Sequence, residues 1–340
     1  MKHTLKKTGL LLVLALVVAL LTGGCAPGAP EDVVWTVHSC QATNMCMYQS
    51  MEWLNGELEE FTDGHFTLEL FPQSALGYAG STIYEPIGQD LIQAGGMWGA
   101  HVSGRWPTLE AANVAGVAIA TGADVAKLNS IVDEIWDECA AAVAEENMVL
   151  LGIVNTPGRT IVLTEAPEFP LTGRKIRAGV EWEGKVAEYL GATPVTVEFS
   201  EVYMAAQRGV VDGIGTDRPS TLGMKFYEPC PHILEWQLGL NFGYFVANKD
   251  NFEALPTEWQ DKLVELGRQF TTYADGVQKE GIKEATEELT TLGATFYPVP
   301  DEMVEAVIDK IVSEYIPGWQ ESTPDPQAAE LVETLVTKFS

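Results

Sequence analysis

The sequence is poor in basic residues: its 340 residues include 20 lysines and arginines against 48 aspartates and glutamates, a net charge of −28. Lys2, Lys6 and Lys7 lie in the first segment, and without them 17 basic residues oppose 48 acidic ones, a net charge of −31. Nucleic-acid binding needs a basic face that neutralises phosphates, so this class of partner is excluded. Because arginines are few, any arginine in a pocket becomes a candidate for recognising an anion.

The sequence also lacks an apolar run long enough to span a bilayer. The run from Leu10 to Leu21 has twelve residues, whereas a transmembrane helix needs about 20. Basic residues precede this run and Thr22-Gly23-Gly24-Cys25 follows it, which is the pattern of a secretory signal. We therefore expect residues 1–25 to direct export.

The small residues before Cys25 resemble the bacterial lipoprotein box, in which the cysteine becomes the lipidated first residue of the mature protein. Thr22 occupies the position that is normally leucine, and Leu21 lies one position earlier. We favour lipidation of Cys25 over ordinary cleavage, with residues 26–32 as a short tether. The expected location is the periplasm or the outer face of the cytoplasmic membrane.

Other cysteine and histidine patterns carry little chemistry. Cys40, Cys46, Cys139 and Cys230 remain after Cys25; in an oxidising compartment they permit three disulfide pairings, and buried free thiols are an equally ordinary alternative. The sequence has no CxxC, GxSxG or HExxH motif and no His/Cys cluster. It therefore predicts no metal, no cofactor and no catalytic residue.

Length and periodicity predict an α/β fold in two lobes. About 310 mature residues exceed what one core comfortably holds. Single strands such as 66–70, where apolar and polar residues alternate, are separated by helical patterns such as 125–146 and 181–190, which favours α/β layers with largely parallel sheets. The apolar face of 257–292 predicts one helix of about 54 Å, long enough to lie across both lobes.

The stretch from Arg174 to Pro256 contains several ordered blocks that resemble the solute-binding proteins of TRAP transporters, the DctP-type family. The resemblance extends over nearly all of the mature chain. The blocks are Lys175-Ile176-Arg177, Leu190-Gly191-Ala192-Thr193-Pro194-Val195, Phe199-Ser200-Glu201-Val202-Tyr203, Gln207-Arg208-Gly209-Val210-Val211-Asp212-Gly213, Lys225-Phe226-Tyr227-Glu228, Asn248-Lys249 and Phe252 to Pro256.

The resemblance implies a two-lobed, periplasmic-binding-protein-like α/β fold with chain crossovers and a long helix spanning both lobes. In this family the lobes close on the ligand, usually a carboxylate, and the loaded protein docks on a sodium-driven permease. We expect lobe I to comprise residues 33–156 and 243–281, lobe II residues 157–242 and 282–320, and residues 321–340 to form a C-terminal helix.

Two arginines match family positions near the ligand. Arg177 matches the arginine that grips the ligand carboxylate, and a guanidinium offers parallel donors that fit a carboxylate as a bidentate pair. Outside this motif, a surface arginine paired with a carboxylate would be the commoner case. Arg159 matches a position that is often basic, with a structural role in the hinge as the alternative. Arg174 is assigned to the surface.

The loop after Asp212-Gly213 departs from the family. Relatives that bind sialate or dicarboxylates carry a Gln/Ala-Glu-Asn-Pro run here, whereas this chain has Ile214 to Pro219. Thr216 falls at the asparagine position and can still form a hydrogen bond to the ligand. Asp217 either pairs with Arg218 or points inward and favours a ligand with hydroxyl or amino groups. Specificity for sialate or C4-dicarboxylates therefore does not transfer directly.

Further pocket candidates come mostly from the first lobe. Gln41 and Asn44 follow the first strand, and Trp98 follows an expected turn at Gly95-Gly96 and would supply a flat apolar wall. Trp236 is another candidate, with plain core packing as its alternative. Nearby Cys40 and His101 are minor candidates, and a lone histidine near a glycine loop is more often structural.

The sequence thus predicts an extracytoplasmic solute-binding protein of a TRAP transporter, a monomer that captures a small organic acid by lobe closure and delivers it to a membrane permease. An ABC-type or sensory solute-binding lipoprotein would share the architecture. An envelope enzyme acting on an organic acid is the alternative of another class, and it would need a nucleophile and a base held by a third group. The identity of the acid stays open.

Overall fold

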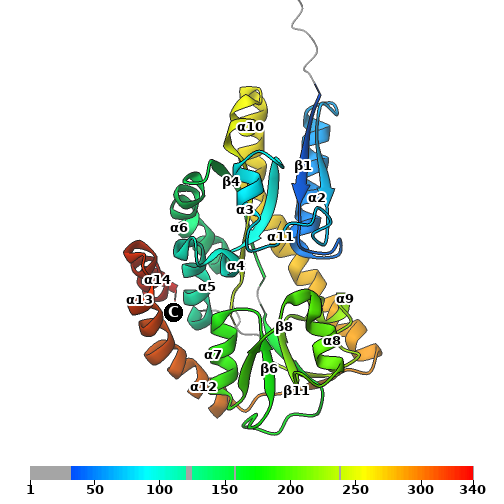
Figure 1. The fold of residues 1–340 in the computed structure, drawn as a ribbon, viewed down its shortest axis with the longest axis vertical. Helices are drawn as coiled ribbons and strands as arrows, with labels where there is room; N and C mark the ends of the chain where they lie inside the picture. The colour runs from blue at the N-terminus through cyan, green and yellow to red at the C-terminus, as the bar shows by residue number, and fades with distance from the viewer. Residues whose placement is uncertain (1–31, 120–124, 157, 237–238, 340) are drawn as a thin grey trace, which may run out of the picture.

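Two mixed β-sheets, one above the other in Figure 1, organise the chain, with helices packed around each. The computed structural model describes residues 32–119, 125–156, 158–236 and 239–339. The predicted signal segment, Cys25 and most of the predicted tether lie outside these residues.

The first sheet has five strands in the order β2-β1-β3-β10-β4. The first three strands along the chain are parallel, and β10 runs antiparallel to both β3 and β4. The bounds are β1 Val33–His38, β2 Phe66–Phe71, β3 Ala94–Trp98, β4 Met148–Asn155 and β10 Phe242–Asn248.

The second sheet has six strands in the order β11-β9-β5-β8-β6-β7. Here β6 is parallel to β7 and β8, and β11 is parallel to β9, whereas β5 is antiparallel to β8 and β9. The bounds are β5 Thr160–Leu163, β6 Lys175–Ala178, β7 Thr193–Thr196, β8 Gly213–Thr216, β9 His232–Leu234 and β11 Thr295–Tyr297.

Helices connect the strands and cover both sheets. Their bounds are α2 Cys46–Phe61, α3 Tyr84–Gly88, α4 Gly99–Val102, α5 Pro107–Ile119, α6 Val125–Ala144, α7 Glu181–Tyr189, α8 Val202–Gln207, α9 Arg218–Gly223, α10 Lys249–Ala254, α11 Thr257–Thr291, α12 Asp301–Lys310, α13 Ile316–Ser322 and α14 Pro326–Phe339, with a π-helical turn at Ile311–Tyr315.

The strand predicted at 66–70 and the helices predicted at 125–146, 181–190 and 257–292 occur within two residues of their expected bounds, and α14 covers 326–339 of the expected 321–340. Two other expectations were wrong. The sheets are not largely parallel, because β5 and β10 each enter a sheet against the direction of their neighbours. Gly95 and Gly96 do not form a turn but lie inside β3. A Cβ on Gly96 would lie 2.9 Å from the methyl carbon of Met51, so Gly96 lets α2 approach the sheet closely.

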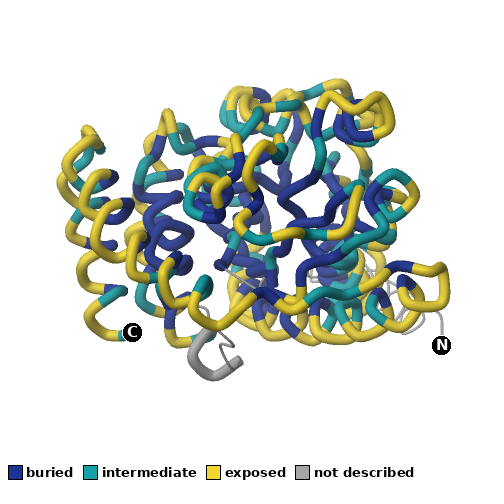
Figure 2. Tube along the Cα trace, turned by 90° about the horizontal axis from the view of Figure 1, so that it is seen from below, coloured by how far each residue is buried: buried dark blue, intermediate teal, exposed yellow. Residues whose placement is uncertain are grey.

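Helix α2 covers one face of the first sheet. Met47, Met51, Leu54 and Leu58 recur at helical spacing and are fully or almost fully buried, and they pack in one cluster with strand residues such as Phe66. Burying an apolar side chain of this size stabilises the fold by about 1.5–3 kcal/mol. Figure 2 shows the same division over the whole molecule, with buried segments at the centre and exposed segments on the outer helices.

Helix α11 packs into the cores of both sheets, as the predicted long helix should. Its first half buries Leu263, Leu266 and Phe270 with α2 and the first sheet. Its second half buries Ala285 and Leu289 with residues of the second sheet and α8. Figure 1 shows the helix running from the upper part of the molecule to the lower part.

The first half of α11 lies directly on β4. A Cβ on Gly267 would stand 1.8 Å from the carbonyl oxygen of Leu151. One turn later, Thr271 Oγ1 donates a hydrogen bond to the carbonyl of Ile153 at 2.7 Å. One further turn brings Asp275, which is 3% exposed and whose two carboxylate oxygens have no hydrogen-bond partner among the described residues.

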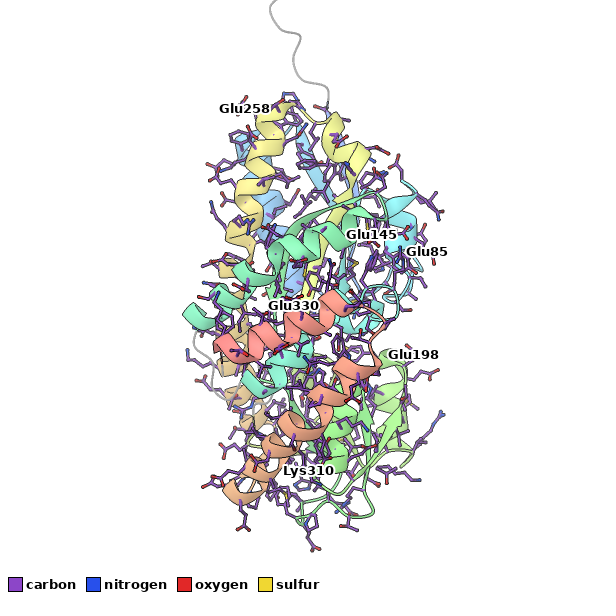
Figure 3. All side chains as sticks on the ribbon, turned by 90° about the vertical axis from the view of Figure 1, so that its left-hand side faces the viewer. Glu85, Glu145, Glu198, Glu258, Lys310 and Glu330 are labelled. Carbon is purple, nitrogen blue, oxygen red and sulfur yellow. The ribbon has the colours of Figure 1, made fainter. Side chains whose placement is uncertain are left out.

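Acidic side chains dominate the outer surface. Glu85, Glu145, Glu258 and Glu330 are exposed, and Figure 3 labels them at well-separated points along the molecule. The C-terminal α14 packs against α5, where Thr108 Oγ1 donates to Asp325 Oδ2 at 2.8 Å. Among the described residues, we found no helix whose length and apolar character would let it cross a bilayer.

Gly267→Ala should destabilise the protein by about 3 kcal/mol or more, because a backbone carbonyl occupies the position of the new methyl group. The matched control is Gly276→Ala on the same helix, where a Cβ would meet nothing within 4 Å. The control should stabilise by roughly 0.5–1 kcal/mol through helix propensity. Urea unfolding of both variants measures the difference, and equal effects would contradict the close approach of α11 to β4.

Asp275→Asn should change how stability depends on pH. Burial raises the pKa of Asp275 to about 6, although Lys279 lowers it. As pH rises, Asp275 ionises at a lower pH in the unfolded chain than in the folded protein. The stabilisation that the folded protein gains from protonated Asp275 is therefore full below about pH 4 and is lost by pH 6–7. The free energy of unfolding of Asp275→Asn, relative to the unaltered protein, should therefore rise by about 2–3 kcal/mol between pH 4 and pH 7.5. A constant difference in urea titrations across this range would contradict the assignment.

Candidate functional site

A cavity of about 600 Å³ lies where the two sheets face each other. Its wall is built mainly from segments that follow the carboxyl ends of parallel strands, namely β1, β2 and β3 of the first sheet and β6, β7 and β8 of the second. Ligands in α/β proteins bind at such strand ends. The lining residues used below are Gln41, Cys40, Cys46, Trp98, His101, Arg159, Arg177, Glu198, Phe199, Asp217, Ser220 and Gln278.

Arg177 on β6 reaches the cavity wall while being only 6% exposed. Its Nε donates to the carbonyl of Val197 at 3.1 Å, and its guanidinium carbon lies 5.7 Å from the ring centre of Phe199. No carboxylate of the described residues forms an ion pair with it. Burial lowers the pKa of Arg177, but an arginine stays protonated. This side chain is therefore a buried cation that lies near Glu183 and Glu198 but forms no ion pair with a carboxylate of the described residues.

A glycine makes room for this guanidinium. A Cβ on Gly179 would stand 2.7 Å from Nη1 of Arg177. The backbone N–H of Gly179 donates at 2.8 Å to Oε2 of Glu183. The turn after β6 thus fixes both the arginine and the neighbouring carboxylate.

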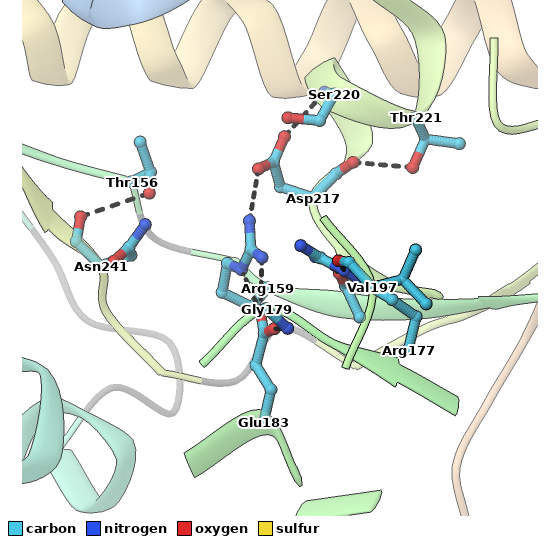
Figure 4. Close-up of polar contacts among 11 residues, drawn as sticks. Thr156, Arg159, Arg177, Gly179, Glu183, Val197, Asp217, Ser220, Thr221 and Asn241 are labelled. Atoms are coloured by element: carbon cyan, nitrogen blue, oxygen red, sulfur yellow. Dashed lines mark hydrogen bonds and ion pairs between the residues drawn. The ribbon is translucent and has the colours of Figure 1, made fainter. Parts of the chain in front are cut away.

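Arg159, just before β5, lies between two carboxylates (Figure 4). Its Nε donates to Glu183 Oε1 at 2.8 Å, its Nη2 forms an ion pair with the same oxygen, and its Nη1 donates to Asp217 Oδ2 at 2.8 Å. All three side chains are largely buried, with exposed fractions of 15% for Arg159, 6% for Glu183 and 8% for Asp217. The charge of Arg159 is therefore already balanced within the protein.

The two carboxylates around Arg159 are held on their other sides as well. Asp217 Oδ1 accepts from the backbone N–H of Ser220 at 2.7 Å, which caps the start of α9. Burial opposes ionisation of Glu183, but Arg159 and Arg177 together lower its pKa below the usual value. Glu183 is thus held in its anionic form, and both oxygens of Asp217 are fixed by hydrogen bonds.

Five of the eight predicted ligand contacts line this cavity: Arg177, Arg159, Asp217, Trp98 and Gln41. Gln41 also accepts, through Oε1, the backbone N–H of Met47 at 3.0 Å at the start of α2. Cys40 and His101 lie on the same wall. These residues come from five separate stretches of sequence, which the fold brings together.

The other three predicted contacts lie elsewhere. Thr216 is 1% exposed, and its hydroxyl has no partner among the described residues. Side chains alternate along a strand, so Thr216 points away from the face that presents Asp217. Trp236 borders a separate small cavity of about 20 Å³ beside Trp182. Asn44 is exposed, with its amide near Gly223 of α9.

The alternative pairing of Asp217 with Arg218 was wrong. Asp217 points inward to Arg159. Arg218 instead donates to Thr286 Oγ1 at 3.0 Å and lies 4.9 Å from the ring centre of Phe296. Consecutive residues at a helix start project in different directions, which keeps these two side chains apart.

Sequence reasoning missed Glu183, which pairs with Arg159 behind the cavity wall, and several residues of the wall itself. Glu183 is one of 48 acidic residues, and no local pattern distinguishes it. Glu198 and Phe199 lie two and three residues after the end of β7, so the rule that strand ends line binding sites could have found them. Gln278 is a buried polar residue on α11, and its position near the middle of the predicted long helix was the available signal.

Burial shifts the pKa values of His101, Cys40 and Cys46 on the wall toward the neutral form of each group. Burial, then the charge of Arg177, lowers the pKa of His101. Burial raises the pKa of Cys40 and raises that of Cys46 to about 12. The four described cysteines are free thiols. Among the described residues, no group of three or more His, Cys, Asp or Glu is arranged to hold a metal.

Comparison with known proteins gives partial matches to periplasmic binding proteins. The C4-dicarboxylate-binding periplasmic protein DctP of Rhodobacter capsulatus is 32% identical over 135 residues, 35% of this chain and 40% of that protein. The match therefore spans less than half of that relative. The 2,3-diketo-L-gulonate-binding periplasmic protein YiaO of Escherichia coli K12 is 26% identical over 251 residues, 70% of this chain and 74% of that protein.

A solved structure shows the same fold. The TRAP periplasmic solute-binding protein of Desulfovibrio salexigens with bound orotic acid superposes with a TM-score of 0.81 at 17% identity, covering 91% of this chain and 100% of that chain. This likeness confirms the predicted two-lobed α/β fold. The sequence pattern of the DctP family, bacterial extracellular solute-binding protein family 7, matches residues 37–317. Since that match covers most of the chain, this protein belongs to the DctP family of bacterial extracellular solute-binding proteins.

Proposed function

We propose that this protein is the extracytoplasmic solute-binding subunit of a TRAP transporter, which captures a small organic acid and delivers it to a membrane permease. The observation that carries the proposal is Arg177, a buried cation at the wall of the cavity with no ion-pair partner among the described residues. A carboxylate supplies the missing charge and can accept two parallel N–H donors from one guanidinium.

The cavity suits a small molecule. Its volume of about 600 Å³ falls within the range of ordinary ligand pockets, about 300–1,000 Å³. Trp98 and Phe199 contribute apolar surface, and Gln41, Ser220 and Gln278 contribute groups that can hydrogen-bond a ligand. A few polar groups on an apolar wall are what orient and select small ligands.

Binding operates through lobe closure in this proposal. We assign residues 33–156 and 243–281 to one lobe, 157–242 and 282–320 to the other, and 321–340 to a C-terminal helix. The cavity wall draws on both, so a ligand that touches both walls favours the closed state and shifts the population toward it. The permease then recognises the closed monomer.

The proposal involves no chemical transformation of the ligand. The thiols of Cys40 and Cys46 stay protonated because burial raises their pKa, which leaves them poor nucleophiles. Burial and the charge of Arg177 lower the pKa of His101, which favours its neutral form. The wall is thus suited to holding an anion, and the family to which the chain belongs consists of solute-binding proteins.

Arg177→Ala should weaken binding of the cognate acid by about 100-fold or more, because it removes the buried partner of the ligand carboxylate. Arg177→Lys should also lose about tenfold, since an ammonium cannot replace the planar fork. A thermal-shift screen of carboxylates, keto acids and sulfonates supplies the ligand, and isothermal titration calorimetry gives the Kd.

Arg174→Ala is the matched control. Arg174 lies at the surface, where it pairs with Glu165 at 2.8 Å, and its removal should leave the Kd unchanged. An unchanged Kd in correctly folded Arg177→Ala would show that Arg177 does not bind the ligand carboxylate.

Export and lipid anchoring at Cys25 complete the proposal. The basic, apolar and small-residue segments of 1–25 support a signal that ends at a lipidated cysteine. One lipid-modified residue would hold the protein at the membrane, and residues 26–32 would tether it.

Cys25→Ala should therefore release the protein from the membrane. In cells expressing the full chain, the unaltered protein should fractionate with membranes and carry a lipid mass on its N-terminal peptide. The variant should lose that mass and either become soluble or remain uncleaved. Recovery of the unaltered protein in the soluble fraction, without lipid, would exclude the anchor.

A further inference from the structure

We infer that the ligand is a monocarboxylate with an N–H or O–H donor elsewhere in the molecule, rather than a dicarboxylate. The inference rests on the proposed function and names the ligand class for the same cavity. It follows from which cation of the wall still has donors that no carboxylate of the described residues occupies.

The wall contains two arginines but offers one unpaired cation. Arg159 faces Glu183 on one side and Asp217 on the other. Two full carboxylates around one guanidinium give this group of three residues a net charge of −1. A ligand carboxylate that approached Arg159 would therefore be repelled by the two carboxylates beside it, because like charges repel strongly at short range.

Arg177 lies near that group but is not part of its ion pairs. Its charge lowers the pKa of Glu183, and it forms no ion pair of its own among the described residues. Its Nη1 has only a long contact of 3.5 Å with the carbonyl of Gly215, so its terminal donors remain open to a ligand. One carboxylate completes this site, whereas a second would find no cation.

Glu198 determines what the rest of the ligand can carry. It is exposed, lines the cavity and is near enough to influence the pKa of both Arg177 and His101. A carboxylate at this place only accepts hydrogen bonds. It therefore favours a ligand hydroxyl, amide N–H or ammonium group and repels a second ligand carboxylate.

A panel of matched acids tests the ligand class. Each dicarboxylate is paired with two monocarboxylates of the same skeleton, in which the second carboxylate is replaced by a carboxamide or a hydroxymethyl group. Succinate, succinamate and 4-hydroxybutyrate form one such set. Binding is measured by calorimetry at pH 7.5 and fixed ionic strength.

The tightest member of the panel should be a monocarboxylate that binds at least about tenfold more tightly than its dicarboxylate partner. Tighter binding of the dicarboxylate would overturn this inference and leave the proposed function intact. Absence of binding by every carboxylate, when the protein is folded, would overturn the proposed function itself.

Asp217→Asn tests the cause of the preference. Asparagine can still cap α9 at Ser220, so the variant removes one charge from Arg159 with little change of shape. The Kd ratio of dicarboxylate to monocarboxylate should shift toward the dicarboxylate by about tenfold. Glu183→Gln, which removes the other carboxylate, should shift the ratio in the same direction and serves if Asp217→Asn does not fold.

Glu165→Gln is the matched control. It removes a carboxylate from Arg174 at the surface, changing the net charge of the protein by the same amount. The ratio should stay constant in this variant. An unchanged ratio in both cavity variants, or an equal shift in the control, would overturn the assignment of the preference to the neutralised Arg159.

Discussion

The ion pairs of Arg159 with Glu183 and Asp217 are the interaction on which the binding site depends. They join the start of β5, helix α7 and the start of α9 at one point beneath the cavity. Breaking a buried ion pair by removing one partner leaves an uncompensated charge and is costly, about 3–5 kcal/mol. The same two carboxylates occupy Arg159 and thereby leave Arg177 as the cation that faces a ligand.

The second organising constraint is helix α11, which belongs to both cores. Leu263, Leu266 and Phe270 hold it to the first sheet, and Ala285 and Leu289 hold it to the second. Gln278 lies between these two sets and reaches the cavity. The helix therefore connects the packing of each lobe to the place where the ligand is held.

Much of the fold could be predicted from sequence, because in long segments such as α11 the spacing of apolar residues is enough to predict a helix. The direction of β5 and β10 could not, since it depends on where the chain crosses between sheets. In the site, the motif around Arg177 led to a cavity residue, and alternation along β8 explains why Asp217 and not Thr216 faces inward. Glu183 had no local signal, because its role comes from proximity to Arg159 in space.

The acidic exterior has a kinetic consequence. An anion approaching a protein of net charge −28 is repelled at long range, and attraction to Arg177 acts only once the anion is inside the cavity. Salt screens the exposed charges within about 10 Å at 0.1 M but screens buried ones much less. Higher ionic strength should therefore raise the association rate of the ligand without raising its dissociation rate by the same factor. A salty medium thus favours faster ligand binding by this receptor.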